Sequence, residues 1–216
     1  NNGKTYIAYI FAGGESTAAT ARSVDFDGTN DYLSIPDSTD YDFGTGDFTI
    51  EAWVKYEGSN AASTNDTIID TRNGESGGSA DAGWIFILRS TGKIGFHHGA
   101  IGWQESTTVL STNTWYHVAV TRNGNDFRVF INGTEEADNS HSGSVDAGSN
   151  FRIGYKVPYS ASSLTYWNGK ISNLRIVKGT ALYTSSFRPP TEPLTNITNT
   201  KLLCCNNSST TGSTVS

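Results

Sequence analysis

Dipeptides that favour tight turns recur along the sequence, and they constrain its fold more than any other feature. They stand at Asp27-Gly28, Asn73-Gly74, Asn123-Gly124, Asn132-Gly133 and Asn168-Gly169. Both central residues of a type I′ hairpin turn need a positive φ, which Asn, Asp and Gly adopt most easily. The spacing therefore predicts short antiparallel strands joined by hairpins.

The segments between these turns alternate with a period of two residues, which is typical of strands. Residues 115–122 and 127–131 alternate on either side of one turn, and a second turn follows them, which predicts a three-stranded meander. No window shows a convincing helical stripe. We expect further strands near 23–26, 32–35, 67–71, 84–89, 93–98, 107–110, 151–154 and 170–177. Residues 47–56 alternate most clearly, with Phe48, Ile50, Ala52, Val54 and Tyr56 opposite Thr49, Glu51, Trp53 and Lys55. The fold class predicted is all-β, a two-sheet antiparallel sandwich.

Composition excludes several classes of protein. Only 17% of the residues are charged, against about 25% in an average domain. The net charge of -6 provides no basic surface for nucleic acid or an anionic membrane. The longest apolar run, residues 84–88, is far shorter than the roughly 20 residues that span a bilayer, so we expect no membrane insertion. The only cysteines, Cys204 and Cys205, are adjacent, and we expect two small buried side chains rather than a disulfide framework.

Four ordered segments resemble the concanavalin A-like jelly-roll superfamily, in particular its laminin G and pentraxin-like branch. They read SVDFDGTNDYL at 23–33, GDFTIEAWV at 46–54, WYHVAVTR at 115–122 and VFING at 129–133. The resemblance implies a jelly roll over residues 22–190. We expect residues 1–21 to be a strand or linker from a preceding module, and residues 191–216 to be a C-terminal strand segment with a polar linker. The chain has no Met, so we also expect it to be a fragment.

A narrower resemblance concerns large virion proteins of marine bacteriophages. It rests on YIAYIFA at 6–12, ISNLRIVKGTALY at 171–183 and KLLCC at 201–205. It implies a non-enzymatic module of a tail-fibre or appendage protein on the virion surface, which contacts neighbouring modules or subunits and could recognise host surface glycans. A secreted or cell-surface carbohydrate-binding adhesin is the alternative.

The sequence does not favour an enzyme. Related jelly-roll glucanases carry a Glu-x-Asp-x-x-Glu string on one strand, and no such string occurs here. Glu51 has Thr49 and Trp53 two positions away, not a second carboxylate. Adjacent residues of a strand point to opposite faces, so His97 and His98 do not form a metal pair. We expect His117 to be a hydrogen-bonded residue within the sheet.

Two kinds of binding site remain as hypotheses. Laminin G and pentraxin-like domains hold calcium at a sandwich rim, so the resemblance implies Ca²⁺ at Asp70, Asn73 and Asp81, with ordinary turn capping as the alternative. Glycan binding needs exposed aromatic rings, for which we select Trp103, Tyr159 and Tyr166. We expect Trp84 and Trp167 to pack inside the sandwich instead.

Overall fold

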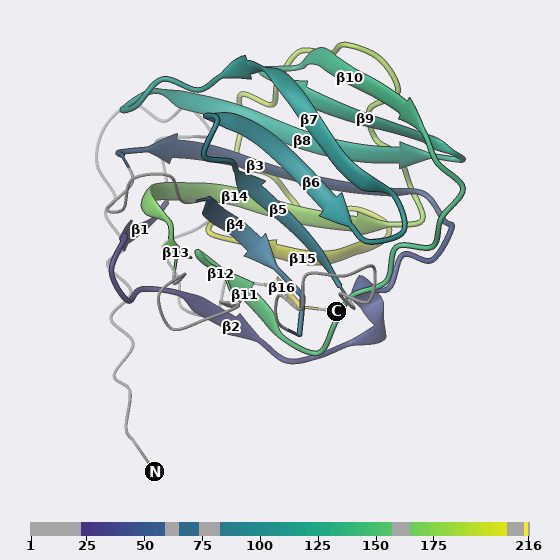
Figure 1. Ribbon diagram of the computed structural model, residues 1–216, viewed down its shortest axis with the longest axis horizontal. Coiled ribbons are helices and arrows are strands. Elements are labelled where there is room, and N and C mark those ends of the chain that lie inside the picture. Colours follow the sequence, from purple (N-terminus) through teal and green to yellow (C-terminus); the bar gives the residue numbers. More distant parts are fainter. Residues whose placement is uncertain (1–22, 59–64, 74–82, 157–164, 207–213, 216) are drawn as a thin grey trace.

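The computed structural model describes residues 23–58, 65–73, 83–156, 165–206 and 214–215, and they form two antiparallel sheets packed face to face (Figure 1). The larger sheet has the order β10 (Thr134–Ser140), β9 (Asp126–Ile131), β8 (Trp115–Asn123), β3 (Phe48–Tyr56), β14 (Asn168–Lys178), β15 (Thr200–Cys204) and β16 (Thr214–Val215), with β1 (Val24–Asp27) also paired to β14. The smaller sheet has the order β2 (Leu33–Ile35), β11 (Phe151–Ile153), β4 (Asp66–Asp70), β5 (Trp84–Leu88), β6 (Lys93–His98) and β7 (Gly102–Val109). A two-stranded ribbon of β12 (Tyr155–Lys156) and β13 (Thr165–Tyr166) and the 3-10 helix η1 (Thr39–Tyr41) complete the fold. The all-β antiparallel sandwich is confirmed.

Hairpin turns form at some of the predicted dipeptides but not at all of them. Asn168-Gly169 lies within β14, where both residues pair with β1, so it forms no hairpin turn. Asp27-Gly28 stands at the end of β1, and because β1 and the next strand, β2, belong to different sheets, this dipeptide does not join a hairpin either. Gly74 lies outside the described residues. The meander of β8, β9 and β10 turns at Asn123-Gly124 and Asn132-Gly133, and Asn132 has a φ of 50°. Strand β7 begins at Gly102, earlier than the predicted start at 107. Its first residues are polar around one exposed Trp, so they lack the apolar alternation by which the other strands are detected.

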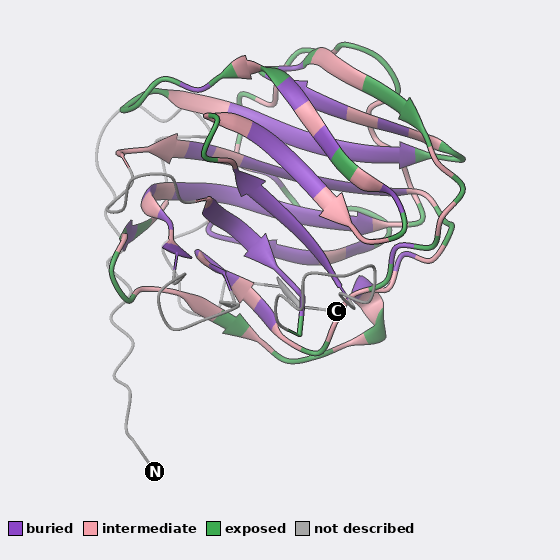
Figure 2. Ribbon diagram, viewed as in Figure 1, coloured by how far each residue is buried: buried purple, intermediate pink, exposed green. Residues whose placement is uncertain are grey.

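The core lies between the sheets and is built from the alternating residues. Phe48 and Ile50 of β3 are completely buried, and the Phe48 ring meets Phe96 of the opposite sheet with ring centroids 5.6 Å apart. Trp84 and Trp167 are also fully buried, as predicted. Figure 2 shows the central strands of the larger sheet buried along most of their length.

The outer face of the larger sheet is covered by residues 180–199, which we call the strap. Thr121 of β8 donates a hydrogen bond to the strap carbonyl of Tyr183 at 2.9 Å, and the Phe187 N–H donates to Gly133 O at 2.8 Å. Polar residues on this face, such as Thr121 and Glu51, are consequently buried. After the strap the chain enters β15, which pairs with β14, so the sandwich includes residues beyond 190. Residues 6–12, expected to form an N-terminal strand, lie outside the described residues.

Candidate functional site

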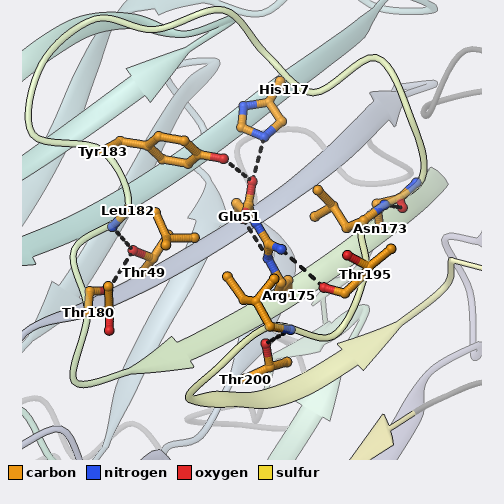
Figure 3. Close-up of polar contacts among 12 residues, drawn as sticks. Thr49, Glu51, His117, Asn173, Arg175, Thr180, Leu182, Tyr183, Thr195 and Thr200 are labelled. Atoms are coloured by element: carbon orange, nitrogen blue, oxygen red, sulfur yellow. Dashed lines mark hydrogen bonds and ion pairs between the residues drawn. The ribbon is translucent and has the colours of Figure 1, made fainter.

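Glu51 stands at the centre of a buried polar cluster beneath the strap (Figure 3). One carboxylate oxygen accepts from the Tyr183 hydroxyl at 2.8 Å and lies 3.0 Å from Nε2 of His117. The other accepts from Nε of Arg175 at 2.8 Å, and Arg175 also donates to Thr195 O at 3.2 Å. His117 is therefore a hydrogen-bonded sheet residue, as expected.

The charges in this cluster are fixed rather than available for chemistry. Burial by itself raises the pKa of Glu51, but the hydrogen bond with His117 and the charge of Arg175 together lower that pKa below its ordinary value of 4.5. Burial and the neighbouring Glu51 charge raise the pKa of the Tyr183 hydroxyl well above 10.0. Because Glu51 and His117 are fully buried, no substrate reaches them. The cluster attaches the strap to the sheet.

The outer face of the smaller sheet carries an exposed aromatic group, the Trp103 platform, which we define as Arg89, His97, Trp103 and Glu105. Trp103 is 37% exposed. The guanidinium carbon of Arg89 lies 4.3 Å from its ring centroid, and the His97 ring centroid lies 4.6 Å away. Arg89 also forms an ion pair with Glu105. Trp103 is thus both accessible to solvent and held by its neighbours.

Gly95 makes room for this platform. Phe96 points into the core, so Gly95 and His97, its neighbours on β6, face outward. A Cβ at Gly95 would lie 3.1 Å from the side chain of Arg89 and 3.1 Å from ring carbons of Trp103. The missing side chain allows both groups to lie close to the sheet.

Tyr166 belongs to a different aromatic group. Its ring centroid lies 4.7 Å from that of Tyr155, and Tyr155 lies 5.2 Å from Tyr32. Arg152 stands over Tyr155 at 5.4 Å. The ribbon that carries Tyr166 packs beside β4, three strands from β7, which is about 14 Å at the usual strand spacing. The structure therefore does not join Tyr166 to Trp103, and Tyr159 lies outside the described residues.

Sequence reasoning selected Trp103 but missed the residues that hold it. Arg89 follows β5, and His97 faces Trp103 across the pairing of β6 with β7. Tyr32 and Tyr155 were also missed. The signal that would have found them is strand register, and local alternation in the sequence does not contain it.

The residues proposed for calcium have other partners. Asp70 is fully buried, and its two oxygens accept from Nε and Nη2 of Arg72, each at 2.9 Å. The side-chain oxygen of Asn73 accepts from the backbone N–H and the hydroxyl of Ser149. In this arrangement the two residues do not fit a calcium site, and the described residues contain no group of three or more His, Cys, Asp or Glu that could hold a metal ion. Asp81 lies outside the described part of the chain, so calcium binding stays a prediction.

Comparison with known proteins decides the family. Residues 27–182 match the family model of the concanavalin A-like lectin/glucanases superfamily. The chain belongs to this superfamily. No curated protein matches the sequence. Most of the strap lies beyond the matched range of this concanavalin A-like chain. Among its described residues, no helix is long and apolar enough to cross a membrane.

Solved structures of distant relatives share the concanavalin A-like fold. A putative carbohydrate binding protein from Bacteroides ovatus is 19% identical with a TM-score of 0.62, over 87% of this chain and 52% of its own. Domain 4 of AbnA, an extracellular arabinanase from Geobacillus stearothermophilus solved with arabinotriose, is 18% identical with a TM-score of 0.56, over 82% and 78%. Domains LG4-5 of the mouse laminin alpha1 chain are 17% identical with a TM-score of 0.51, over 79% and 47%. The chain thus spans about half the length of the Bacteroides and laminin chains.

Proposed function

We propose that this chain is a non-enzymatic carbohydrate-binding module whose binding site is the Trp103 platform. The observation that carries the proposal is the 37% exposure of Trp103 on a sheet whose other large aromatic residues are mostly buried. Sugar rings present C–H faces that pack on aromatic rings, while their hydroxyls need polar partners at the edge. Such polar groups adjoin the indole: Arg89 lies over part of the ring, His97 lies beside it, and Glu105 is paired with Arg89. The putative carbohydrate binding protein of Bacteroides and the arabinanase domain bound to arabinotriose support a sugar as ligand.

The platform is organised before a ligand arrives. The Arg89 guanidinium is held by its ion pair with Glu105 and by the indole of Trp103. Because these side chains are already ordered, binding loses less conformational entropy than it would with free side chains. The polar groups select hydroxyl-rich ligands over purely apolar ones.

We further propose that the module is part of a tail-fibre or appendage polypeptide on a phage virion, where it contacts neighbouring modules and recognises glycans of the host surface. This step rests on the resemblance of residues 6–12, 171–183 and 201–205 to phage virion proteins. Sequencing of the genes on either side tests it. Capsid or tail genes would support the virion, whereas secretion genes would support a secreted or cell-surface adhesin.

A glycan array followed by calorimetry on the best ligand tests the binding site. Trp103→Ala should weaken binding at least tenfold, because aromatic contacts of this kind contribute about 1.4 kcal/mol or more. Val109→Ala is the matched control, because Val109 is 57% exposed on the same strand and lies outside the platform. Equal affinities for Trp103→Ala and the unmodified chain would exclude the platform, and an array without any bound glycan would exclude glycan recognition.

A further inference from the structure

Cys204 and Cys205 bring their two thiols together on one side of the larger sheet. Adjacent residues of a strand normally point to opposite faces. Cys205 has a φ of 59°, in the left-handed region, so its side chain turns back to the side of Cys204. Both side chains belong to the hydrophobic core, 4% and 8% exposed, and their sulfur atoms are 3.6 Å apart. Both are free thiols.

The backbone that creates this arrangement is held from β14 and the strap. The Cys205 carbonyl accepts from the Asn173 N–H at 3.0 Å and from the Ser172 hydroxyl at 3.5 Å. Asn173 also has a positive φ, 52°, and its side-chain oxygen accepts from the Leu194 N–H at 2.7 Å. A left-handed residue other than glycine costs about 1–2 kcal/mol, so such a position persists only when its surroundings hold it. The approach of the two sulfurs is therefore built into the fold.

The 3-10 helix η1, which an ion pair joins to β15, carries a hydroxyl group without a hydrogen-bond partner. Tyr41 of η1 is 1% exposed, and among the described residues its hydroxyl has no partner. The ion pair of Lys201 with Asp40, at 3.0 Å, joins η1 to β15. Burial and the charge of Asp40 raise the pKa of Tyr41 to about 12. A buried hydroxyl without a partner costs about 1–3 kcal/mol, and a polar ligand atom would remove that cost.

The geometry suits chelation better than a disulfide. Neighbouring Cα atoms are about 3.8 Å apart, below the range of about 4.4–6.8 Å that disulfides favour. Two sulfurs 3.6 Å apart, each bound to one centre at a bond length of about 2.3 Å, subtend an angle of about 100°. Zinc has the same bond length but needs four ligands, and the described residues contain no cluster of three or more metal-binding side chains. The arrangement fits a centre that takes two sulfurs from the protein and keeps another substituent.

We propose that Cys204 and Cys205 form a dithiol site for a soft, three-coordinate centre such as trivalent arsenic. With phenylarsine oxide the two S–H bonds break and two S–As bonds form. The arsenic–oxygen bonding is lost, and the oxygen leaves as water with both thiol protons. Arsenic remains trivalent and nothing is oxidised. Access is through Cys205, the more exposed thiol, which directly follows the end of β15 at Cys204.

Intact-mass measurement of the folded chain with phenylarsine oxide tests the site. The Cys205 sulfur and burial raise the pKa of Cys204, so the reaction is run at pH 8 to favour deprotonation. We expect one arsenical per chain, loss of both free thiols, and a higher melting midpoint because the ligand binds the folded state. Dithiothreitol should release it, whereas the same concentration of thiol groups from mercaptoethanol should not.

The single variants Cys204→Ser and Cys205→Ser should each bind the arsenical at least tenfold more weakly. Iodoacetamide, which reacts with one thiol at a time, serves as the chemical control. An unmodified chain that reacts only after unfolding, or whose adduct mercaptoethanol removes as readily as dithiothreitol, would overturn the proposal. Both of those readouts use the unmodified chain, so they hold even if a variant fails to fold.

Discussion

The two outer faces of the sandwich use charged residues in opposite ways. On the larger sheet the strap covers Glu51 and Arg175, whose buried side chains form an ion pair with each other. On the smaller sheet Arg89 and Glu105 form an ion pair whose side chains are about a quarter exposed, beside the accessible Trp103. The comparison shows that a charged residue on a sheet face is accessible to a ligand only where nothing packs over it.

The strap explains why the faces differ. The family match ends at residue 182, so most of the strap lies outside the matched segment. Where it packs on the larger sheet, it supplies Tyr183 and backbone carbonyls such as Thr195 O to the polar side chains below. Within the part of the chain that the structure describes, the smaller sheet has no such cover over Trp103. Replacements of Arg175 and Glu51 test the covered face, and a replacement of Gly95 tests the exposed one.

Replacement of Arg175 by Met should have the largest effect. It leaves the carboxylate of Glu51 buried without its cationic partner, and loss of one member of a buried ion pair costs about 3–5 kcal/mol. Urea denaturation should show a midpoint far below that of the unmodified chain. Lys201→Met is the control, because the ion pair of Lys201 with Asp40 is partly exposed and should contribute less than about 1 kcal/mol. Equal losses in the two variants would show that the strap does not seal the cluster.

The next largest effect should come from Glu51, whose carboxylate makes the stability of the fold depend on pH. Its folded-state pKa lies below 4.5, so its ionised form stabilises the fold above that pH, and this contribution is lost as the pH falls through the folded pKa. Glu51→Gln should be less stable than the unmodified chain at pH 7, and the difference should shrink below about pH 4.5. Urea titrations from pH 7 to pH 3 measure it.

Glu57→Gln provides the exposed comparison for that experiment. The hydrogen bond from Lys55 lowers the pKa of Glu57 as well, but this carboxylate is near the surface, where water screens the interaction. Its removal should change the pH profile little. A difference between Glu51→Gln and the unmodified chain that stays constant down to pH 3 would contradict an ionised, buried Glu51.

Much of the fold could be predicted because hairpin turns and alternation are local signals. Asn132-Gly133 predicts its own turn, and residues 48–56 predict which side chains face the core. The strap could not be predicted in the same way. The alternation of Glu51 with apolar neighbours shows only that it faces away from the core, and does not show that residues 180–199 cover it.

The candidate site was predictable to a smaller extent. Trp103 stands in a glycine-rich, polar segment, which indicates exposure, and the structure places it at the surface. The partners of Trp103 come from β6 and from the chain just after β5, and strand register decides which of their residues meet it. The position of Asp70 shows the same limit. Asp70 is close in sequence to Asn73, but its carboxylate pairs with Arg72.

Replacement of Gly95 by Ala should have the smallest effect. It tests whether glycan binding depends on the close packing of Arg89 and Trp103 over the sheet. Its Cβ would stand 3.1 Å from both Arg89 and the indole of Trp103, so these groups must shift by a few tenths of an ångström. We expect glycan affinity to fall about three- to tenfold, equivalent to roughly 0.7–1.4 kcal/mol, with a loss of stability below about 1 kcal/mol. Gly46→Ala is the matched control, because its Cβ would meet a carbonyl oxygen at 3.2 Å, where it touches none of the platform residues. Unchanged affinity in Gly95→Ala, together with a loss in Trp103→Ala, would mean that the sugar contacts the indole alone and that Arg89 does not position it.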